Sequence, residues 1–189
     1  RDLVRSRGLG DVYKRQQFLS VPLESIGTAM TTYTSQNMGA KDLGRVNRGV
    51  NTALGIGCVY SIASFLILRV TDKLLIGLFL DAGETAIMAN AQSFIFWNSV
   101  FYIPLAVLII YRYTIQGLGF SGLAMFAGVA EMVARTVIAL VLIPVLGYFG
   151  AELSNPVAWV AACLFLYPAY LWTVKHLENR LLAGHLAMR

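Results

Sequence analysis

The residues of this sequence that could do chemistry are polar side chains set inside long apolar stretches. One group is a carboxylate and three hydroxyls between Gln17 and Ala40, namely Glu24, Thr28, Thr31 and Ser35. Their offsets of 0, 4, 7 and 11 residues place them along one face of an α-helix. Because exposing this stripe to lipid is costly, it predicts a helix that faces a water-filled cavity or packs against another polar helix.

Glu24 is the member of the stripe that could carry a proton or bind a cation. Burial in a low dielectric disfavours the charged carboxylate, which suits a group that takes up and releases a proton. A structural role, with Glu24 held by hydrogen bonds, is equally open. The three hydroxyls either line the same cavity or bond to their own backbone carbonyls.

Glu131 and Arg135 form a second ionisable pair inside an apolar stretch. Their spacing of i, i+4 brings the two side chains together on one helix face. One interpretation is a buried ion pair that neutralises its own charge. The other is a pair that opens when a ligand binds.

A third group, Trp97, Asn98 and Tyr102, places aromatic rings beside an amide. Asn98 and Tyr102 are again spaced i, i+4. An aromatic ring next to an amide suits a flat or cationic organic molecule, through stacking and cation-π contact. Ordinary hydrogen bonding between helices explains the pair equally well.

The composition indicates the kind of protein that positions these groups. Of the 189 residues, 57% are hydrophobic and 13% are charged, whereas about 25% are charged in a soluble domain. This excludes soluble enzymes, nucleic-acid-binding modules and disordered proteins. The formal net charge of +5 therefore does not indicate a nucleic-acid partner.

Five stretches are long enough to cross a bilayer, which takes about 20 apolar residues. They are residues 17–40, 49–68, 85–111, 120–147 and 153–174. The sequence thus predicts an all-α, polytopic membrane protein with five transmembrane helices.

The short connections between these stretches differ in charge, and Lys and Arg favour the cytoplasmic side. The connections on one side, with the tail 175–189, carry seven bases: Lys41, Arg45, Arg48, Arg112, Lys175, Arg180 and Arg189. The other side has only Arg69 and Lys73, beside several acids. We therefore expect a multi-pass protein of the plasma (bacterial inner) membrane whose C-terminal tail is cytoplasmic.

Residues 1–16 differ sharply from the rest of the sequence, because seven of them are charged. Ser6 to Gln16 read SRGLGDVYKRQ, which is the translation of a common transposon sequencing adapter. We expect 1–16 to be a non-native, adapter-derived segment, so that Gln17 opens in the middle of the natural polypeptide. A basic tail or signal n-region is the alternative.

Residue types that serve catalysis or metal binding are scarce. Cys58 and Cys163 lie inside apolar stretches, which favours neither a disulfide nor a metal site. His176 and His185 both lie in the tail, and no Gly-x-Ser-x-Gly or His-Glu-x-x-His motif is present. We expect no enzyme activity, no catalytic or metal-binding residues and no organic cofactor.

Several local motifs, in this order, resemble the multidrug and toxic compound extrusion (MATE) family. The first is a Gln-x-x-Gly-Ala ending before a basic loop, carried by Pro22, Gly27, Gln36, Asn37, Met38, Gly39, Ala40, Lys41, Arg45 and Arg48. The second runs from a basic helix end to the last stretch, through Tyr111, Arg112, Gln116, Gly117, Gly119, Glu131, Arg135, Gly147, Gly150, Asn155 and Pro156. Matched in this way, residues 17–174 correspond to helices eight to twelve, most of a six-helix C-terminal lobe.

The resemblance implies a twelve-helix antiporter of two lobes that exports small organic, often cationic, compounds in exchange for H⁺ or Na⁺. The lobes would rock about a central cavity. The partners implied are the lipid bilayer and a missing N-terminal lobe of the same polypeptide, without which the fragment should not transport. In the sodium-driven branch an acid of the tenth helix helps bind the cation, whereas residues 85–111 contain no acid, so Glu24 is the best available carboxylate.

An alternative from the same broad superfamily is a flippase of lipid-linked oligosaccharides or precursors. Such transporters usually carry several cationic groups for a pyrophosphate. Here Arg135 is the one base expected at depth, and Glu131 offsets it, so the exporter is preferred. A membrane-embedded enzyme is less well supported still.

Overall fold

The structure is a computed structural model that describes residues 2–79 and 85–186, with side chains described for residues 19–70 and 92–183. These residues form helices joined by short turns, and no strand occurs among them. The elements are α1 (Asp2–Gly39), α2 (Leu43–Phe79), α3 (Thr85–Val100), α4 (Tyr102–Gly117), α5 (Ser121–Val137), a π-helical segment η1 (Ile138–Leu142), α6 (Ile143–Leu146), α7 (Tyr148–Glu152) and α8 (Ser154–Leu186). The expected all-α architecture is confirmed.

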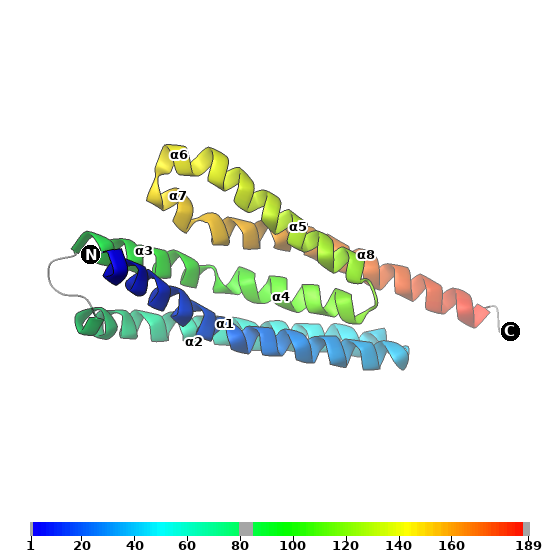
Figure 1. The fold of residues 1–189 in the computed structure, drawn as a ribbon. Helices are drawn as coiled ribbons and strands as arrows, with labels where there is room; N and C mark the ends of the chain where they lie inside the picture. Colours follow the sequence, from blue (N-terminus) through cyan, green and yellow to red (C-terminus); the bar gives the residue numbers. More distant parts are fainter. Residues whose placement is uncertain (1, 80–84, 187–189) are drawn as a thin grey trace.

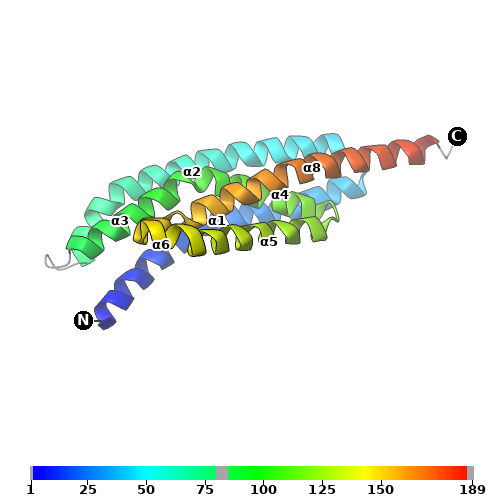
Figure 2. The same cartoon turned by 90° about the horizontal axis from the view of Figure 1, so that it is seen from above.

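The helices are arranged as a bundle with α4 in the middle. Figure 1 shows the α3 and α4 layer between the α1 and α2 pair and the group formed by α5 to α8. The C-terminal ends of α1, α4 and α8 lie at one end of the bundle (Figures 1 and 2). The connections 40–42 and 118–120 therefore share that end with the C-terminal tail, as the alternation of charge predicts.

Tight turns at this end follow from local hydrogen bonding. After α1, the amides of Lys41 and Asp42 donate to the carbonyls of Met38 and Asn37, both at 2.9 Å, and Lys41 adopts a positive φ of 59°. Asp42 Oδ1 then accepts the amide hydrogen of Arg45 at 2.8 Å. Such a side chain satisfies one of the free amides at the start of α2.

The stretch 85–111, expected to be one uninterrupted helix, is broken. It bends by 49° between residues 92–100 and 102–117, at Phe101 with φ −93° and ψ 17°. Pro104 lies in the first turn of α4, where a missing amide hydrogen costs no helical bond. The helix then continues past residue 111, so Arg112 lies within α4 and not in a connecting loop.

A second reversal occurs between α6 and α7. Gly147 has a φ of 59°, a conformation that side chains disfavour. Gly150 then packs so closely on the backbone of η1 that an added Cβ would lie 2.8 Å from the carbonyl oxygen of Leu142. These two glycines allow the chain to turn from α6 into α8 within a few residues.

The core surrounds α4. Tyr102, Ile110 and Ile115 are at most 1% exposed, and α4 packs against α1, α2, α5 and α8. Many apolar side chains on the outer faces of α2, η1 and α8 are instead exposed, among them Val59, Leu140 and Leu164 at 70% or more. An outer surface of this kind favours contact with lipid.

Three segments are long and apolar enough to cross a bilayer, namely Leu43–Val70, Ser121–Leu146 and Ser154–Ala183, and the bent pair 92–117 makes a fourth if it counts as one span. This bears out the polytopic prediction. Among the described residues α1 does not reach the same hydropathy, because Glu24 and a run of hydroxyls and amides dilute its apolar residues. The predicted span over residues 17–40 is therefore not among the segments that are long and apolar enough to cross a bilayer.

The structure also extends two expected boundaries. The helix α1 runs without a break from Asp2, so no change of backbone marks the predicted border at Gln17. The last helix continues to Leu186, well beyond residue 174. The origin of residues 1–16 stays a prediction.

Candidate functional site

Two adjacent residues of α4, Arg112 and Tyr113, connect α4 to two different neighbours. Arg112 contacts α5 and Tyr113 contacts α1. Consecutive residues on a helix point about 100° apart, because a turn takes 3.6 residues. The ionisable groups of the two neighbouring helices are thereby gathered around one turn of α4.

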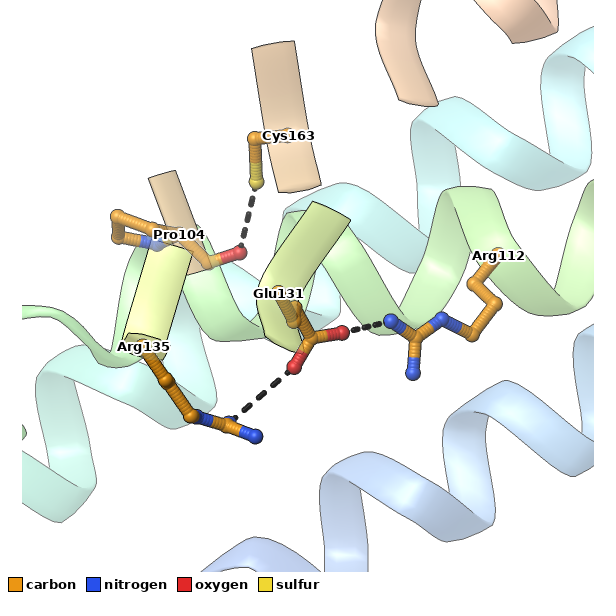
Figure 3. A network of polar contacts seen from close by, with 5 residues as sticks. All are labelled: Pro104, Arg112, Glu131, Arg135 and Cys163. Atoms are coloured by element: carbon orange, nitrogen blue, oxygen red, sulfur yellow. Dashed lines mark hydrogen bonds and ion pairs between the residues drawn. The ribbon is translucent and has the colours of Figure 1, made fainter. Parts of the chain in front are cut away.

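On the α5 side, one carboxylate accepts from two guanidinium groups. Arg112 Nη2 pairs with Glu131 Oε1, and Arg135 Nη2 lies 3.3 Å from Glu131 Oε2. Figure 3 shows the Glu131 carboxylate between the two arginines. The side chain of Glu131 is 11% exposed, whereas those of Arg112 and Arg135 are 28% and 44% exposed. The predicted contact of Glu131 with Arg135 is present, and Arg112 joins it.

Arg112 has a further polar atom that lacks a partner among the described residues. Its Nε is buried and makes no hydrogen bond there. Arg135 pairs with the same carboxylate as Arg112, and Glu24 reaches the next residue of α4, Tyr113. The cluster therefore holds two carboxylates and two guanidinium groups on three helices, and their formal charges balance.

On the α1 side, three members of the predicted stripe bond to α4. Tyr113 donates its hydroxyl to Glu24 Oε2 at 2.8 Å, and Thr31 Oγ1 donates to the Tyr113 carbonyl at 3.1 Å. Ser35 Oγ donates to the carbonyls of Gly117 at 3.1 Å and of Thr31 at 2.8 Å. The stripe thus packs against another helix along much of its length.

The two N-terminal residues of the stripe behave differently from Thr31 and Ser35. Thr28 bonds to the carbonyls of its own helix, those of Glu24 at 3.1 Å and Ser25 at 2.9 Å, as one of the two interpretations of the hydroxyls expects. Glu24 is exposed and not buried. Because the stripe follows the edge of the contact with α4, its N-terminal carboxylate reaches past the packed surface.

Glycines let α1 and α4 approach so closely. A Cβ added to Gly27 would lie 2.5 Å from Tyr113 Cδ2, and one added to Gly117 would lie 2.7 Å from the carbonyl oxygen of Thr31. Small residues at such crossings are typical of helix packing in membranes. The hydrogen bonds of Thr31 and Ser35 to α4 depend on this short distance.

The structure does not bring Trp97, Asn98 and Tyr102 together as a binding site. Asn98 and Tyr102 are each 1% exposed, and the break at Phe101 lies between them. Asn98 Oδ1 accepts from Asn155 Nδ2 at 3.2 Å on α8. The centroid of the Tyr102 ring lies 6.5 Å from that of Trp159, which also belongs to α8. This geometry favours the interpretation that the pair ties helices together.

Trp97 is half-buried among other aromatic rings. Its centroid lies 5.5 Å from that of Phe96 and 5.7 Å from that of Phe149, both in edge geometry. Such contacts stabilise packing. They leave a role of Trp97 in substrate binding as a prediction.

One buried carboxylate was not expected from the sequence, that of Glu152, which was counted among the acids of the connections beside Arg69 and Lys73. Glu152 is 2% exposed, and its Oε2 accepts from Ser93 Oγ at 2.6 Å. Burial raises the pKa of the nearby Tyr148, and the charge of Glu152 adds to the shift. The α7 turn carries Glu152 inward against α3, a contact that the neighbouring residues in the sequence do not reveal.

The two cysteines are free thiols at half-buried positions. Cys163 Sγ donates to the carbonyl of Pro104 at 3.1 Å, which links α8 to the first turn of α4 (Figure 3). Within the ranges that the structure describes, no three His, Cys, Asp or Glu residues are grouped so as to hold a metal ion.

A comparison with protein-family models matches the MatE model over residues 12–141. The match covers α1 to η1, apart from the first residues of α1 and the last of η1, and includes both α4 contacts described above. Searches of the curated proteins and of the solved structures found no match. The match spans more than half of the chain, whose helices are those of a polytopic protein, and it identifies the chain as a multi-pass membrane protein of the MatE family, a family of transporters.

Proposed function

We propose that the native polypeptide is a cation-coupled exporter of small organic, often cationic, compounds in the plasma membrane. Membership of the MatE family supports the transporter class. The basic residues gathered at the end of α1, α4 and α8 support an orientation with the C-terminus in the cytoplasm. Transport would follow alternating access, with the lobe that contains α1 to α8 rocking against a second lobe.

The observation that carries the coupling proposal is the unequal pairing of the two carboxylates beside α4. Glu131 is already held by two guanidinium groups. Among the described residues Glu24 is bonded only by the neutral hydroxyl of Tyr113, and it is exposed. Because Glu24 makes no ion pair within the described residues, whereas Glu131 makes two, Glu24 is the better placed of the two carboxylates to take up an ion. In this proposal Glu24 is the coupling group, with H⁺ or Na⁺ as its ion.

The test is export by the native polypeptide in a drug-sensitised host, with the proton and the sodium gradients collapsed in turn. We expect Glu24→Gln to remove most of the gradient-driven export, because glutamine still accepts from Tyr113 yet cannot hold a proton or a cation as a carboxylate does. Glu178→Gln is the matched control, since Glu178 is an exposed carboxylate of α8 far along the helix. Gradient-driven export that survives Glu24→Gln would overturn the coupling role.

One structural observation favours a second candidate, the flippase of lipid-linked precursors. Arg112 was expected in a loop but lies in the helical cluster, so two guanidinium groups and not one stand beside Glu131. Because Glu24 and Glu131 together balance both arginines, we still prefer the exporter. Flipping of a pyrophosphate-linked lipid in proteoliposomes, lost in Arg112→Gln and Arg135→Gln, would reverse this preference.

A further inference from the structure

A groove of about 410 Å³ runs between α1 and α2 on the outer surface of the bundle. Its walls are mostly apolar and include Ile26, Met30 and Ile56. Arg48 lines the groove at the end that the basic connection occupies. The groove therefore combines an apolar channel with a cationic mouth.

Tyr33 fixes the shape of the mouth. Its ring lies where a side chain at position 49 would be, because a Cβ added to Gly49 would come within 2.2 Å of Tyr33 Cε1. The Tyr33 hydroxyl donates to the carbonyl of Arg45 at 3.2 Å. The ring is thus held against the first turns of α2, next to Arg48, in the position that aromatic residues take at a membrane surface.

The charges at the mouth are predominantly positive. Arg45 and Arg48 lie on the same stripe of α2, and Lys41 lies in the turn before it. Asp42 offsets one of them, at 3.7 Å from Arg45 Nε. Arg48 is exposed and makes no ion pair within the described part of the chain, so it is available to an anion.

Further along the groove the polar groups are already satisfied. Thr52 Oγ1 donates to the carbonyl of Arg48 at 3.0 Å, which turns the hydroxyl back to its own helix and leaves the methyl group to the groove. From Arg48 to Ile56 the helix rises about 12 Å. This length beside a cationic mouth matches a hydrocarbon chain below an anionic headgroup.

We propose that this groove binds a phospholipid with an anionic headgroup, whose phosphate contacts Arg48 and whose acyl chain lies between α1 and α2. Basic side chains beside membrane helices attract anionic lipids of the cytoplasmic leaflet. The proposal requires only that the bundle is embedded in a bilayer. It does not depend on the ion or the compound that the protein transports.

The experiment measures lipid binding to the purified native polypeptide by native mass spectrometry, with dioleoyl phosphatidylglycerol and dioleoyl phosphatidylcholine as probes. We expect preferential binding of phosphatidylglycerol, weakened about fivefold by Arg48→Gln, as loss of one basic contact at a membrane surface implies. Arg180→Gln, at an exposed base on α8, is the matched control and should change nothing. Equal binding by the parent and Arg48→Gln would overturn the proposal.

Three further arms separate a lipid from other occupants. Thr52→Phe fills the apolar channel and should reduce phosphatidylglycerol binding while Arg48 stays in place, whereas soluble glycerol 3-phosphate should not bind measurably. Binding of glycerol 3-phosphate as tight as that of the lipid would reduce the site to a phosphate site and overturn the acyl contact. With Cys58 and Cys163 replaced by alanine, a membrane-soluble maleimide should label Thr52→Cys once bound lipid has been removed. Failure to label it in the lipid-depleted protein would show that another protein segment fills the groove, which also overturns the proposal.

Discussion

The two sides of α4 are stabilised by different kinds of interaction, although Arg112 and Tyr113, which make the two contacts, are neighbours in the chain. Toward α5, Arg112 shares the Glu131 carboxylate with Arg135, so the contact is made of charges. Toward α1, Tyr113 and Gly117 meet a carboxylate and two hydroxyls across a crossing that glycines keep short. The α5 side depends on every charge being present, whereas the α1 side depends on distance and tolerates a change at Glu24.

The largest effect is expected on the charged side. Glu131→Gln leaves two guanidinium groups without their carboxylate and should destabilise the folded protein by about 3–5 kcal/mol, since a partly buried charge loses its partner. Thermal unfolding of the purified native polypeptide in detergent measures this loss. Replacing all three residues by apolar ones should restore much of the stability, and a fully stable Glu131→Gln would show that the charges are not coupled.

An intermediate effect is expected where α1 and α4 cross. Gly117→Ala places a methyl group 2.7 Å from the carbonyl oxygen of Thr31, so the two helices must separate at a cost of about 1–3 kcal/mol. Gly128→Ala on α5 is the matched control, because no atom lies within 4 Å of the added Cβ, and it should be neutral or slightly stabilising. The same unfolding assay compares the two variants, and equal losses would contradict the close-contact account.

The smallest effect on stability is expected at the hydrogen bond to Glu24. Tyr113→Phe removes one bond to an exposed carboxylate and should cost no more than about 1 kcal/mol. Under the coupling proposal the same change should nevertheless shift the pH or sodium dependence of export, because it removes the neutral partner of Glu24. Tyr167→Phe, whose ring packs at 6.0 Å from that of Tyr111, is the control. An unchanged ion dependence in Tyr113→Phe would separate Glu24 from coupling.

The sequence predicted the class of fold because long apolar stretches between charges are a direct record of bilayer crossing. It also predicted the Glu131 and Arg135 contact, since spacing of i, i+4 fixes neighbours on one helix. Arg112 could not be assigned to this pair in the same way. It lies 19 residues before Glu131, across a turn, and its partner is set by how α4 and α5 pack.

Two expectations, an unbroken helix over residues 85–111 and a loop position for Glu152, were wrong because both followed from hydropathy. Hydropathy records composition and not the continuity of the backbone or its tertiary contacts. Residues 85–111 lack any charge, and yet the helix breaks at Phe101 just before Pro104. Glu152 looks like a solvated loop acid and is instead turned inward by Gly147 and Gly150. In the first case the proline was a visible signal, whereas in the second the tertiary contact alone decides.

The break at Phe101 divides the middle layer of the bundle into two rods, α3 and α4, which meet at a bend of 49°. The first rod, α3, has 16 residues and is about 24 Å long. A change of about 10° in the bend would swing its far tip by about 4 Å, simply from its length as a lever arm. Ser61 and Cys163 hold the first residues of α4, whereas Asn155 and Glu152 hold α3. Such a swing would therefore break the bonds of α3 and leave α4, with Arg112 and Tyr113, where it stands.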